Sequence, residues 1–396
     1  MNQISHQVMI NLNLYKQYLY VPTKFSQKSD MEEILKQVVC IQLDTINVLT
    51  QAHNLFFLSR MERYKPEWFY DLYEEKKVFE AYLHALSLCH TDLFPYIKPV
   101  FQEFKEKMTE DQQNINFLLD IYNQVKEKQL LESREIKSEK NKRELEAWEM
   151  TPDRWALNHL WRSGLLGVLR SQLFRKKYTT IDNIIAPQYL HKEVDRALIN
   201  QKLILSSLEA LGIATASEIK KYLRVKKQEE VEENIEQLIA NKKVLKIKVN
   251  GFLEDHHISY EDYDLVNSGF LNDIPQSCTF LSPFDNLIWD RQRTFKLFNV
   301  DYRLEAYLPS EQRKYGYYAL PILVQGRIVG TIDLKLNRKE NELIIKSLSI
   351  FNKFEEKNLS RYILQIIERM LLFFNVDNVK IEPPNQSGNT FLAKLF

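Results

Sequence analysis

The sequence predicts an α+β fold in which tandem winged-helix units, each built on a helix-turn-helix, precede a C-terminal antiparallel β-rich domain. Two observations carry this prediction. One is a pattern of three amphipathic helices followed by a hairpin, and the other is a run of alternating strands near the end of the chain. A chain of 396 residues has room for several hydrophobic cores. We expect a first winged-helix unit at 1–100, a helical spacer and second unit at 101–202, a third unit at 203–270 and the β-rich domain at 271–396.

The third unit has the clearest pattern. Its second helix begins with a capping box, in which a Thr hydroxyl and a Glu carboxylate each accept a backbone N–H group. An Asn-Gly pair is typical of a two-residue hairpin turn. In chain order we expect three helices, a strand, a turn and a return strand: Leu203–Leu211 ending at Gly212, Thr215–Leu223, Val231–Ile239, Val244–Val249, Asn250-Gly251, and a strand to about Tyr260.

Weaker versions of this pattern occur twice earlier in the chain. A capping box at Ser29–Glu32 opens an amphipathic helix. A further helix, Trp155–Trp161, stops near Gly164, and short strands then lead to Tyr178. The charged stretch from about 100 to 150 is either a solvated spacer helix or a DNA-facing one, and we favour the spacer.

The C-terminal part changes to alternating strands. We expect an antiparallel meander followed by one amphipathic helix, because polar and apolar residues alternate in each strand and the helix has an apolar stripe. These elements are Arg303–Leu308, Tyr317–Val324, Arg327–Leu336, Glu342–Ser349 and the helix Leu359–Met370.

The composition excludes several classes of protein. Charged residues make up 27% of the chain, which is ordinary for a soluble globular protein, and no apolar run is long enough to span a bilayer. The chain has only nine glycines and neither a P-loop nor a dinucleotide fingerprint. Its three cysteines, Cys40, Cys89 and Cys278, are far apart and form no metal-binding or redox motif. We therefore expect no metal, no cofactor and a reducing, cytoplasmic location.

Basic residues are clustered, although the formal net charge is only +1. Acidic segments such as Glu229–Glu236 balance the total, which predicts a polarised surface. Each cluster alone is equally well explained as a solvated helix face. The clusters are Arg170, Arg175, Lys176 and Lys177; Lys220, Lys221, Arg224, Lys226 and Lys227; and Lys242, Lys243, Lys246 and Lys248.

A polar pair, Gln42 and Asp44, follows the first predicted helix. Side chains alternate along an extended segment, so the amide and the carboxylate face one side and Leu43 turns inward. If that side faces DNA, a carboxylate there is electrostatically costly and needs a chemical reason. Taken alone, the spacing is better explained as a surface turn in which Asp44 caps a helix at 45–49.

A family resemblance runs through most of the chain. Gln42–Val48, Ala52–Leu55 and Ser59-Arg60 resemble the N-terminal signature of the winged-helix DNA glycosylases of the YcaQ/AlkZ type, and Phe79–Ala85 resembles their second signature. The longest match is Leu281–Arg291, and it continues through Asp301–Glu305, Lys314–Tyr318, Gly330–Lys335 and Asn337–Lys339.

The resemblance implies a bacterial repair enzyme that acts on the nucleoid. Such enzymes cleave the N-glycosidic bond of alkylated purines and can unhook interstrand crosslinks. One branch carries Gln-x-Gln at the catalytic motif and the other Gln-x-Asp. With Gln42 and Asp44, this chain resembles the second branch, whose substrate range is broader. There are two departures: Gln51 stands where relatives usually have arginine, which puts a phosphate contact in doubt, and Ala81-Tyr82 replaces a Tyr-Trp pair.

The chemistry implied for this pair is hydrolytic and non-covalent. A purine alkylated at N7 is positively charged and already a good leaving group. The sugar becomes oxocarbenium-like as the bond breaks, so a nearby carboxylate either stabilises that cation or takes a proton from the attacking water. Asp44 suits both roles, and the amide of Gln42 can hold the water.

The other candidate residues have alternatives. Glu80 and His84 are one helical turn apart, half of a metal site, but no second pair of ligands is evident. Structural support of the site is favoured for them, with lesion contact second. His53 is either a buried histidine or a DNA contact. The predicted DNA contacts are Arg60, Lys220, Lys221, Arg224, Lys246 and Arg291. Four aromatic residues can stack on bases, but core positions are favoured for most of them: Trp289, Tyr315, Tyr317 and Tyr318.

Two functions from different classes remain. The first is a monofunctional DNA glycosylase, expected to act as a monomer, away from membranes, on double-stranded DNA with alkylated or crosslinked purines. The second is a non-enzymatic winged-helix DNA-binding protein such as a regulator. Asp44 separates them, because a simple binder gains nothing from an anion at its DNA surface.

Overall fold

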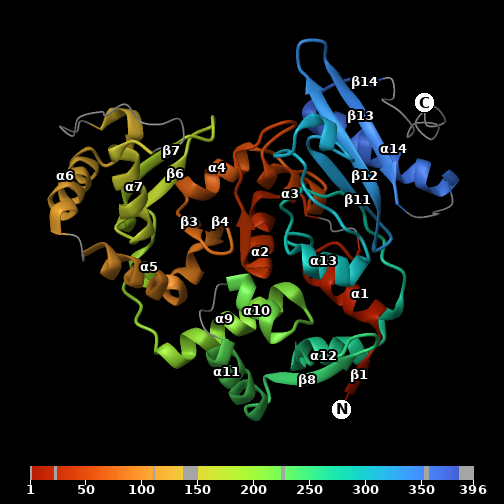
Figure 1. The fold of residues 1–396 in the computed structure, drawn as a ribbon, viewed down its shortest axis with the longest axis horizontal. Helices are drawn as coiled ribbons and strands as arrows, with labels where there is room; N and C mark the ends of the chain where they lie inside the picture. The colour runs from red at the N-terminus through yellow and green to blue at the C-terminus, as the bar shows by residue number, and fades with distance from the viewer. Residues whose placement is uncertain are drawn as a thin grey trace.

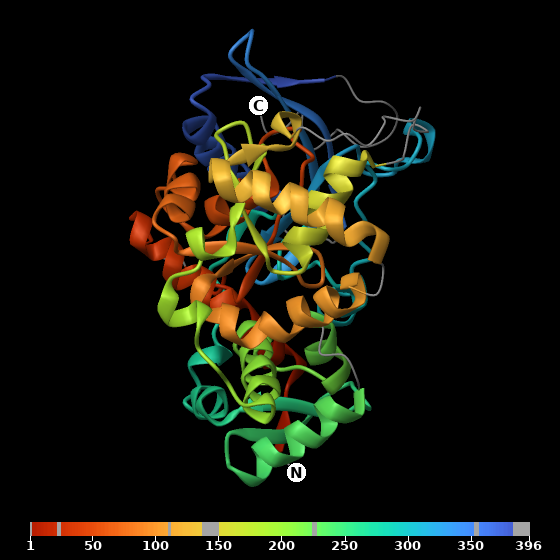
Figure 2. The same cartoon turned by 90° about the vertical axis from the view of Figure 1, so that its left-hand side faces the viewer.

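Among the residues that the computed structural model describes, three small three-stranded sheets and one five-stranded sheet have helices packed around them. The structure describes residues 2–21, 25–109, 112–136, 150–223, 228–351 and 356–382. The first unit lies at the centre of Figure 1, with the second unit to its left, the third below it and the five-stranded sheet to its right. Figure 2 shows the third unit and the five-stranded sheet at opposite ends of the molecule. The mixed α+β class is as predicted.

The first unit is built on a short antiparallel sheet with the strand order β2-β4-β3. The capping box predicted at Ser29–Glu32 is wrong. The helix begins at Lys28, because the Asp30 carboxylate accepts the N–H groups of Ser26 and Gln27 at 2.8 and 2.9 Å. The elements are α2 (Lys28–Val38), β2 (Cys40–Gln42), α3 (Ala52–Arg60), α4 (Glu67–Glu74), β3 (Val78–Tyr82) and β4 (Leu86–His90).

Two further local predictions in this unit are corrected. Glu80 lies on strand β3 and His84 follows its end, so the two residues are not one helical turn apart. Residues 45–49 form no helix. Instead, the Asp44 carboxylate accepts the N–H of Ile46 at 2.8 Å, a local bond that turns the chain as it leaves β2.

The second unit has the predicted helix and hairpin. Its helix α7 is followed by Gly164 at φ +71°, a backbone conformation that favours glycine. The charged stretch before it packs onto the same unit through Leu118, Ile121 and Val125. The elements are α5 (Phe94–Thr109), α6 (Gln112–Lys128), β5 (Leu131–Glu132), α7 (Pro152–Arg162), β6 (Leu166–Arg170), β7 (Lys176–Thr180) and α8 (Pro187–Leu190).

The third unit contains the three predicted helices and the two strands after them. The predicted capping box is present: the Glu218 carboxylate accepts the Thr215 N–H at 2.9 Å, and the Thr215 hydroxyl accepts the Glu218 N–H at 3.3 Å. The elements are α9 (Arg196–Leu211), α10 (Ala216–Leu223), α11 (Gln228–Ala240), β8 (Val244–Val249), β9 (His256–Ser259) and α12 (Tyr260–Asn267).

The hairpin turn predicted at Asn250-Gly251 is wrong in its length. Strands β8 and β9 pair only as far as Ile247 opposite His256, so a longer loop joins them. The end of β8 instead pairs in parallel with β1 (Asn2–Ile4).

The start of the chain therefore packs on the third unit, although the sequence predicts that it belongs to the 1–100 domain. Helix α1 (His6–Lys16) follows β1 and lies along α9. The side chain of Asn13 donates to the carbonyl of Leu211 at 3.0 Å, and that of Gln17 donates to the carbonyl of Ala210 at 2.6 Å.

The C-terminal sheet has the order β10-β11-β12-β13-β14 and is antiparallel except for β14. The strand predicted at Arg303–Leu308 is a loop. The Glu305 carboxylate holds it by accepting the N–H groups of Tyr315 and Gly316 at 2.8 and 3.2 Å. The elements are β10 (Cys278–Phe280), α13 (Arg291–Phe298), β11 (Ala319–Val324), β12 (Arg327–Asn337), β13 (Glu342–Ile350), α14 (Glu356–Phe374) and β14 (Asn378–Ile381).

Strand β2 lies between two hydrophobic cores. Ile41 and Leu43 belong to a core shared with the C-terminal sheet and α14. Val39 and Cys40 belong to a core shared with α9 and α10. Packing on both sides fixes the strand that carries the polar pair. Within the described residues, no helix has the length and apolar character that a membrane span needs.

Candidate active site

Strand β2 and the residues after it present Gln42 and Asp44 as half-buried side chains on one side. On the other side Ile41 and Leu43 are buried, as the alternation of the sequence predicts. Gln42 pairs with Ser87 of β4, and the Leu43 N–H donates to the carbonyl of residue 86 at 2.8 Å. The sheet therefore holds Gln42 and Leu43, and Asp44 is half-buried at the turn that directly follows.

The Asp44 carboxylate has lost part of its hydration. Burial raises the pKa of this carboxyl, and the N–H groups of Ile46 and Thr45 partly offset the rise because they bind the charged form. A partly desolvated anion interacts more strongly with a cation than an anion in bulk water does. This position suits the stabilisation of a positive charge that develops beside it.

Two tyrosines of the C-terminal part lie near Asp44. Burial, and then the charge of Asp44, raise the pKa of Tyr307 and of Tyr318. Tyr318 is fully buried, whereas Tyr307 is 77% exposed. The carboxylate thus lies where the first unit meets the loop that leads into β11, with an exposed aromatic ring nearby.

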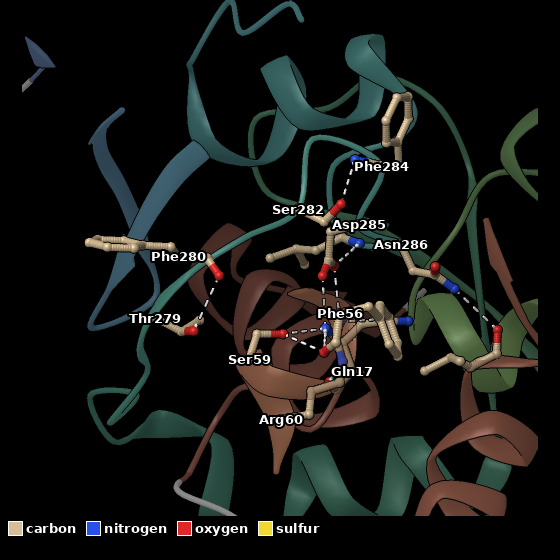
Figure 3. Close-up of polar contacts among 12 residues, drawn as sticks. Gln17, Phe56, Ser59, Arg60, Thr279, Phe280, Ser282, Phe284, Asp285 and Asn286 are labelled. Atoms are coloured by element: carbon tan, nitrogen blue, oxygen red, sulfur yellow. Dashed lines mark hydrogen bonds and ion pairs between the residues drawn. The ribbon is translucent and has the colours of Figure 1, made fainter. Parts of the chain in front are cut away.

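The prediction that Arg60 contacts DNA is wrong, because its side chain is fully buried. Figure 3 shows its guanidinium directed at the Asp285 carboxylate, with Gln17 and Ser59 beside it. The two Arg60–Asp285 hydrogen bonds measure 2.8 and 2.9 Å, and Nε of Arg60 donates to the carbonyl of Gln17 at 2.9 Å. Two nitrogens of the guanidinium thus bind the two oxygens of one carboxylate, and this buried pair has a structural role.

The neighbour of Asp285 anchors β2. Nδ2 of Asn286 donates to the carbonyl of Cys40 at 2.6 Å and to the hydroxyl of Tyr222 at 2.8 Å. The same hydroxyl donates to the carbonyl of Val38 at 2.7 Å. One dipeptide of the C-terminal part therefore fixes both α3 and the backbone at the start of β2.

Glu80 supports the structure and is not exposed to a lesion. Its side chain is 0% exposed and pairs with Arg170 through two bonds of 2.5 and 2.9 Å. The hydroxyl of Tyr73 donates to the same carboxylate at 2.9 Å. Arg170 is therefore buried and does not belong to a basic surface cluster.

His53 is a buried histidine. Its ring stacks on Phe69 at 3.8 Å and on Phe174 at 5.0 Å between centroids. Burial, reinforced by the nearby charge of Arg170, lowers the pKa of His53 to about 3. The ring is therefore neutral at physiological pH and not exposed to phosphate.

His84 is half-buried and stacks on Trp289, with 4.3 Å between the ring centroids. Its Nδ1 lies 3.3 Å from the carbonyl of Tyr222. The preference for core positions among the aromatic candidates is right for Tyr318, whereas Tyr317 is 39% exposed.

The basic candidates of the third unit have different surroundings. Lys220 is half-buried and Lys221 is exposed on α10. Lys221 Nζ lies 3.4 Å from the Asp290 carboxylate, and Lys246 Nζ lies 3.2 Å from that of Asp255. These surface pairs leave the lysines able to exchange partners. Arg224 lies outside the described residues.

Arg291 is largely engaged by the protein itself. Its two terminal nitrogens donate to the carbonyls of Ile288 and Pro283 at 2.8 and 2.9 Å, and its guanidinium lies over the ring of Tyr302. Burial lowers the pKa of Arg291. These contacts favour a structural role over the predicted phosphate contact.

In the part of the chain that the structure describes, no group of three His, Cys, Asp or Glu side chains is placed to hold a metal ion. The site instead offers one carboxylate, one amide and neighbouring tyrosines. Such a set can orient a water molecule, accept its proton and stabilise a cation.

Sequence reasoning missed the partners that hold these groups. Basic neighbours in sequence suggest a surface position for Arg170, and only the fold shows that it meets Glu80. Asp285 and Asn286 lie in the longest family motif, which marks them as important without saying whether chemistry or packing requires them. For Tyr307 the sequence contains no signal, because its proximity to Asp44 depends on how the two domains pack.

A family model described as "DNA glycosylase AlkZ-like" matches residues 35–371. Among solved structures, the chain is similar to the DNA glycosylase AlkZ of Streptomyces sahachiroi, with a TM-score of 0.66 and 13% sequence identity. That match covers 96% of this chain and 100% of the other. At so low a sequence identity, the structural similarity is evidence for a shared fold only.

Proposed function

The chain belongs to the AlkZ-like DNA glycosylase family, and from this premise we propose that it hydrolyses the N-glycosidic bond of purines alkylated at N7. We further propose that it unhooks interstrand crosslinks. The observation that carries the proposal is the half-buried Asp44 carboxylate, two residues after Gln42 and just beyond the end of a strand that is packed on both sides.

In the proposed reaction the alkylated base leaves without protonation, since its positive charge is neutralised as the bond breaks. Asp44 stabilises the oxocarbenium-like sugar or accepts the proton of the attacking water, and Gln42 holds that water. The water adds to the sugar carbon, the base departs with the electron pair of the glycosidic bond, and an abasic site remains. No covalent enzyme intermediate is required.

We propose that residues 196–259 act as a winged helix on DNA, with the first and second units in related roles. The helices and strands of this segment occur in the winged-helix order. Lys220, Lys221 and Lys246 are our candidates for phosphate contacts from this unit. Gln51, in the place of the family's usual arginine, is half-buried, and its side-chain oxygen accepts from Asn54 at 3.1 Å.

The alternative is a winged-helix DNA-binding protein without enzymatic activity. The half-buried Asp44 carboxylate disfavours this alternative. An anion at a DNA-binding surface repels the phosphates, so a protein that only binds DNA would gain nothing from it. Incubation of the protein with a duplex that contains N7-methylguanine separates the two functions. A glycosylase produces alkali-labile abasic sites under single-turnover conditions, whereas a regulator binds the duplex and leaves it intact.

The range of substrates provides a sharper prediction. The exposed ring of Tyr307 near Asp44 suggests a site open on the side of the base, and a crosslinked base cannot rotate freely out of the helix. We expect excision of N7-methylguanine and unhooking of a nitrogen-mustard crosslink in otherwise identical duplexes. Release of the methylated base without any unhooking would refute the open site and leave the glycosylase proposal intact.

Binding to undamaged duplex is expected to weaken steeply with salt. Each neutralised phosphate releases counterions, so several contacts give a log–log slope of roughly −3 to −6. Changing Lys220 to Gln should reduce the slope by about one if this side chain meets a phosphate. Fluorescence anisotropy titrations over a range of salt concentrations measure both slopes. A flat salt dependence would contradict a phosphate-binding surface.

A further inference from the structure

We propose that Arg170 is a positioning residue for the Gln42–Asp44 segment, acting on it through Glu80 from the neighbouring unit. The inference rests on the proposed glycosylase role of that segment and concerns how the segment is held in register. In this proposal the second unit helps to position the catalytic segment, in addition to any contact that it makes with DNA.

The Arg170 guanidinium is fixed by four contacts. It forms the two bonds to the Glu80 carboxylate, and the exposed fractions of the two side chains are 3% and 0%. Its Nη1 donates to the carbonyl of Phe174 at 2.9 Å, and its plane lies over the ring of that residue at 4.3 Å. A planar fork on a carboxylate fixes orientation as well as distance.

The backbone of Glu80 is held from the second unit as well. Nε1 of Trp161, on α7, donates to the Glu80 carbonyl at 3.2 Å. The hydroxyl of Tyr73, on α4, completes the set around the carboxylate. Two side chains of the second unit thus fix this one residue of β3 at both its carboxylate and its carbonyl.

The sheet connects Glu80 to the catalytic segment. On β3 the residue after Glu80 is Ala81, which pairs with Ser87 of β4, and Ser87 pairs with Gln42 on β2. Leu43, between the two catalytic candidates, donates its N–H to β4. A shift of β3 therefore reaches Gln42 through two neighbouring ladders. Because β2 is only three residues long, it has few bonds of its own with which to resist such a shift.

The same hairpin of the second unit also contacts the chain on the other side of the segment. Phe174, whose carbonyl Arg170 holds, stacks on His53 in the first turn of α3. Arg170 therefore acts on both ends of the stretch from residue 42 to residue 53, through the sheet at one end and through the Phe174–His53 stack at the other.

Buried ion pairs are weak evidence for stability alone, because desolvation offsets their attraction. Their geometry matters more here, since a displacement of about 1 Å at a reacting group can slow a reaction about a hundredfold. If Arg170 has a positioning role, breaking the Arg170–Glu80 pair should slow base excision, whereas breaking a buried ion pair elsewhere should not.

The test compares Glu80→Gln and Arg170→Lys with Asp262→Asn as a matched control. Asp262 is also a buried carboxylate in an ion pair, 3.0 Å from Lys16, but it lies on α12 of the third unit. Three quantities are measured on the folded full-length proteins: the single-turnover rate on N7-methylguanine duplex, the Kd for undamaged duplex, and the hydrogen exchange of residues 40–43.

We expect Glu80→Gln to reduce the rate about ten- to a hundredfold while the Kd changes less than about twofold. Arg170→Lys should fall between this variant and the wild type, because lysine keeps the charge and loses the fork. Exchange at residues 40–43 should accelerate in both variants. Asp262→Asn should match the wild type in rate and in exchange at this strand.

A wild-type rate in the Glu80 and Arg170 variants would overturn the proposal, as would an equal loss in the Asp262 control. Failure of the wild-type protein to excise any base would refute the proposed function instead. In that case the exchange comparison alone decides the positioning role: acceleration confined to the Glu80 and Arg170 variants supports it, and equal exchange in all variants refutes it.

Discussion

Asp44→Asn is expected to slow base release from N7-methylguanine duplex at least about a hundredfold, the low end for the loss of a group that transfers protons or stabilises charge. Asparagine has the same shape but carries no charge and cannot accept a proton. The amide can still accept the N–H of Ile46, the bond that turns the chain, so folding and DNA binding should be nearly unchanged. Single-turnover kinetics and binding to undamaged duplex measure the two effects separately.

The pH dependence of the wild-type rate provides a second measurement on Asp44. The carboxylate form is the active one in the proposed reaction, so the rate falls as the pH falls through the pKa of this group. Burial raises that pKa, which moves the acid limb to higher pH than an ordinary aspartate would give. The limb should disappear in Asp44→Asn.

Gln42→Ala is the comparison within the motif, and it should reduce the rate less than Asp44→Asn because it removes only a water-holding amide. Equal rates for the wild type and Asp44→Asn would rule out the catalytic assignment of this carboxylate. Equal losses in the two variants would point to a shared structural role for the strand.

Asp285→Ala is expected to lower the free energy of unfolding by about 3–5 kcal/mol, since it leaves the Arg60 guanidinium buried without its counter-charge. Both side chains of this pair are 0% exposed, so water cannot replace the lost carboxylate without a rearrangement of α3. The same carboxylate also accepts the N–H of Leu287 at 3.0 Å, a bond that the variant loses as well. Denaturant unfolding followed by circular dichroism measures the change.

The matched control for this variant is Glu254→Ala. Its ion pair with Lys296 has the same length as the Arg60–Asp285 pair, 2.8 Å, but its two side chains are 50% and 39% exposed. Solvent screening limits an exposed pair to about 0–1 kcal/mol. Similar losses in the two variants would contradict the claim that burial makes the Arg60–Asp285 pair important.

The parts of the fold predicted correctly are those fixed by neighbours in sequence. The capping box at Thr215 and the alternation around Leu43 depend on residues within a few positions, and both are present in the structure. The errors arise where distant partners decide. Strands β8 and β9 stop pairing at Ile247 and His256, and the end of β8 pairs with the start of the chain instead. Arg303–Leu308 alternates but is a loop.

The candidate site shows the same division. Gln42 and Asp44 are found from spacing together with the family resemblance, because their chemistry is visible in their residue types. Arg60 is misassigned because an arginine in a DNA-repair motif suggests phosphate, and nothing near it in sequence indicates that Asp285 neutralises it. The sequence places Glu80 in the site but contains no sign of its partner Arg170, which lies in another unit.

The parallel pairing of β1 with β8 has a consequence for how the chain reaches its final form. Asn2 lies opposite Ile247, so β1 is synthesised well before the strand with which it pairs. Until β8 has been made, the edge of β1 lacks this partner, a condition that exposes a strand to wrong partners. The cost of closing so long a loop grows only slowly with length, by about 0.6 kcal/mol per doubling. Assembly of this protein is therefore not strictly vectorial: its beginning and its middle must meet before the third unit is complete.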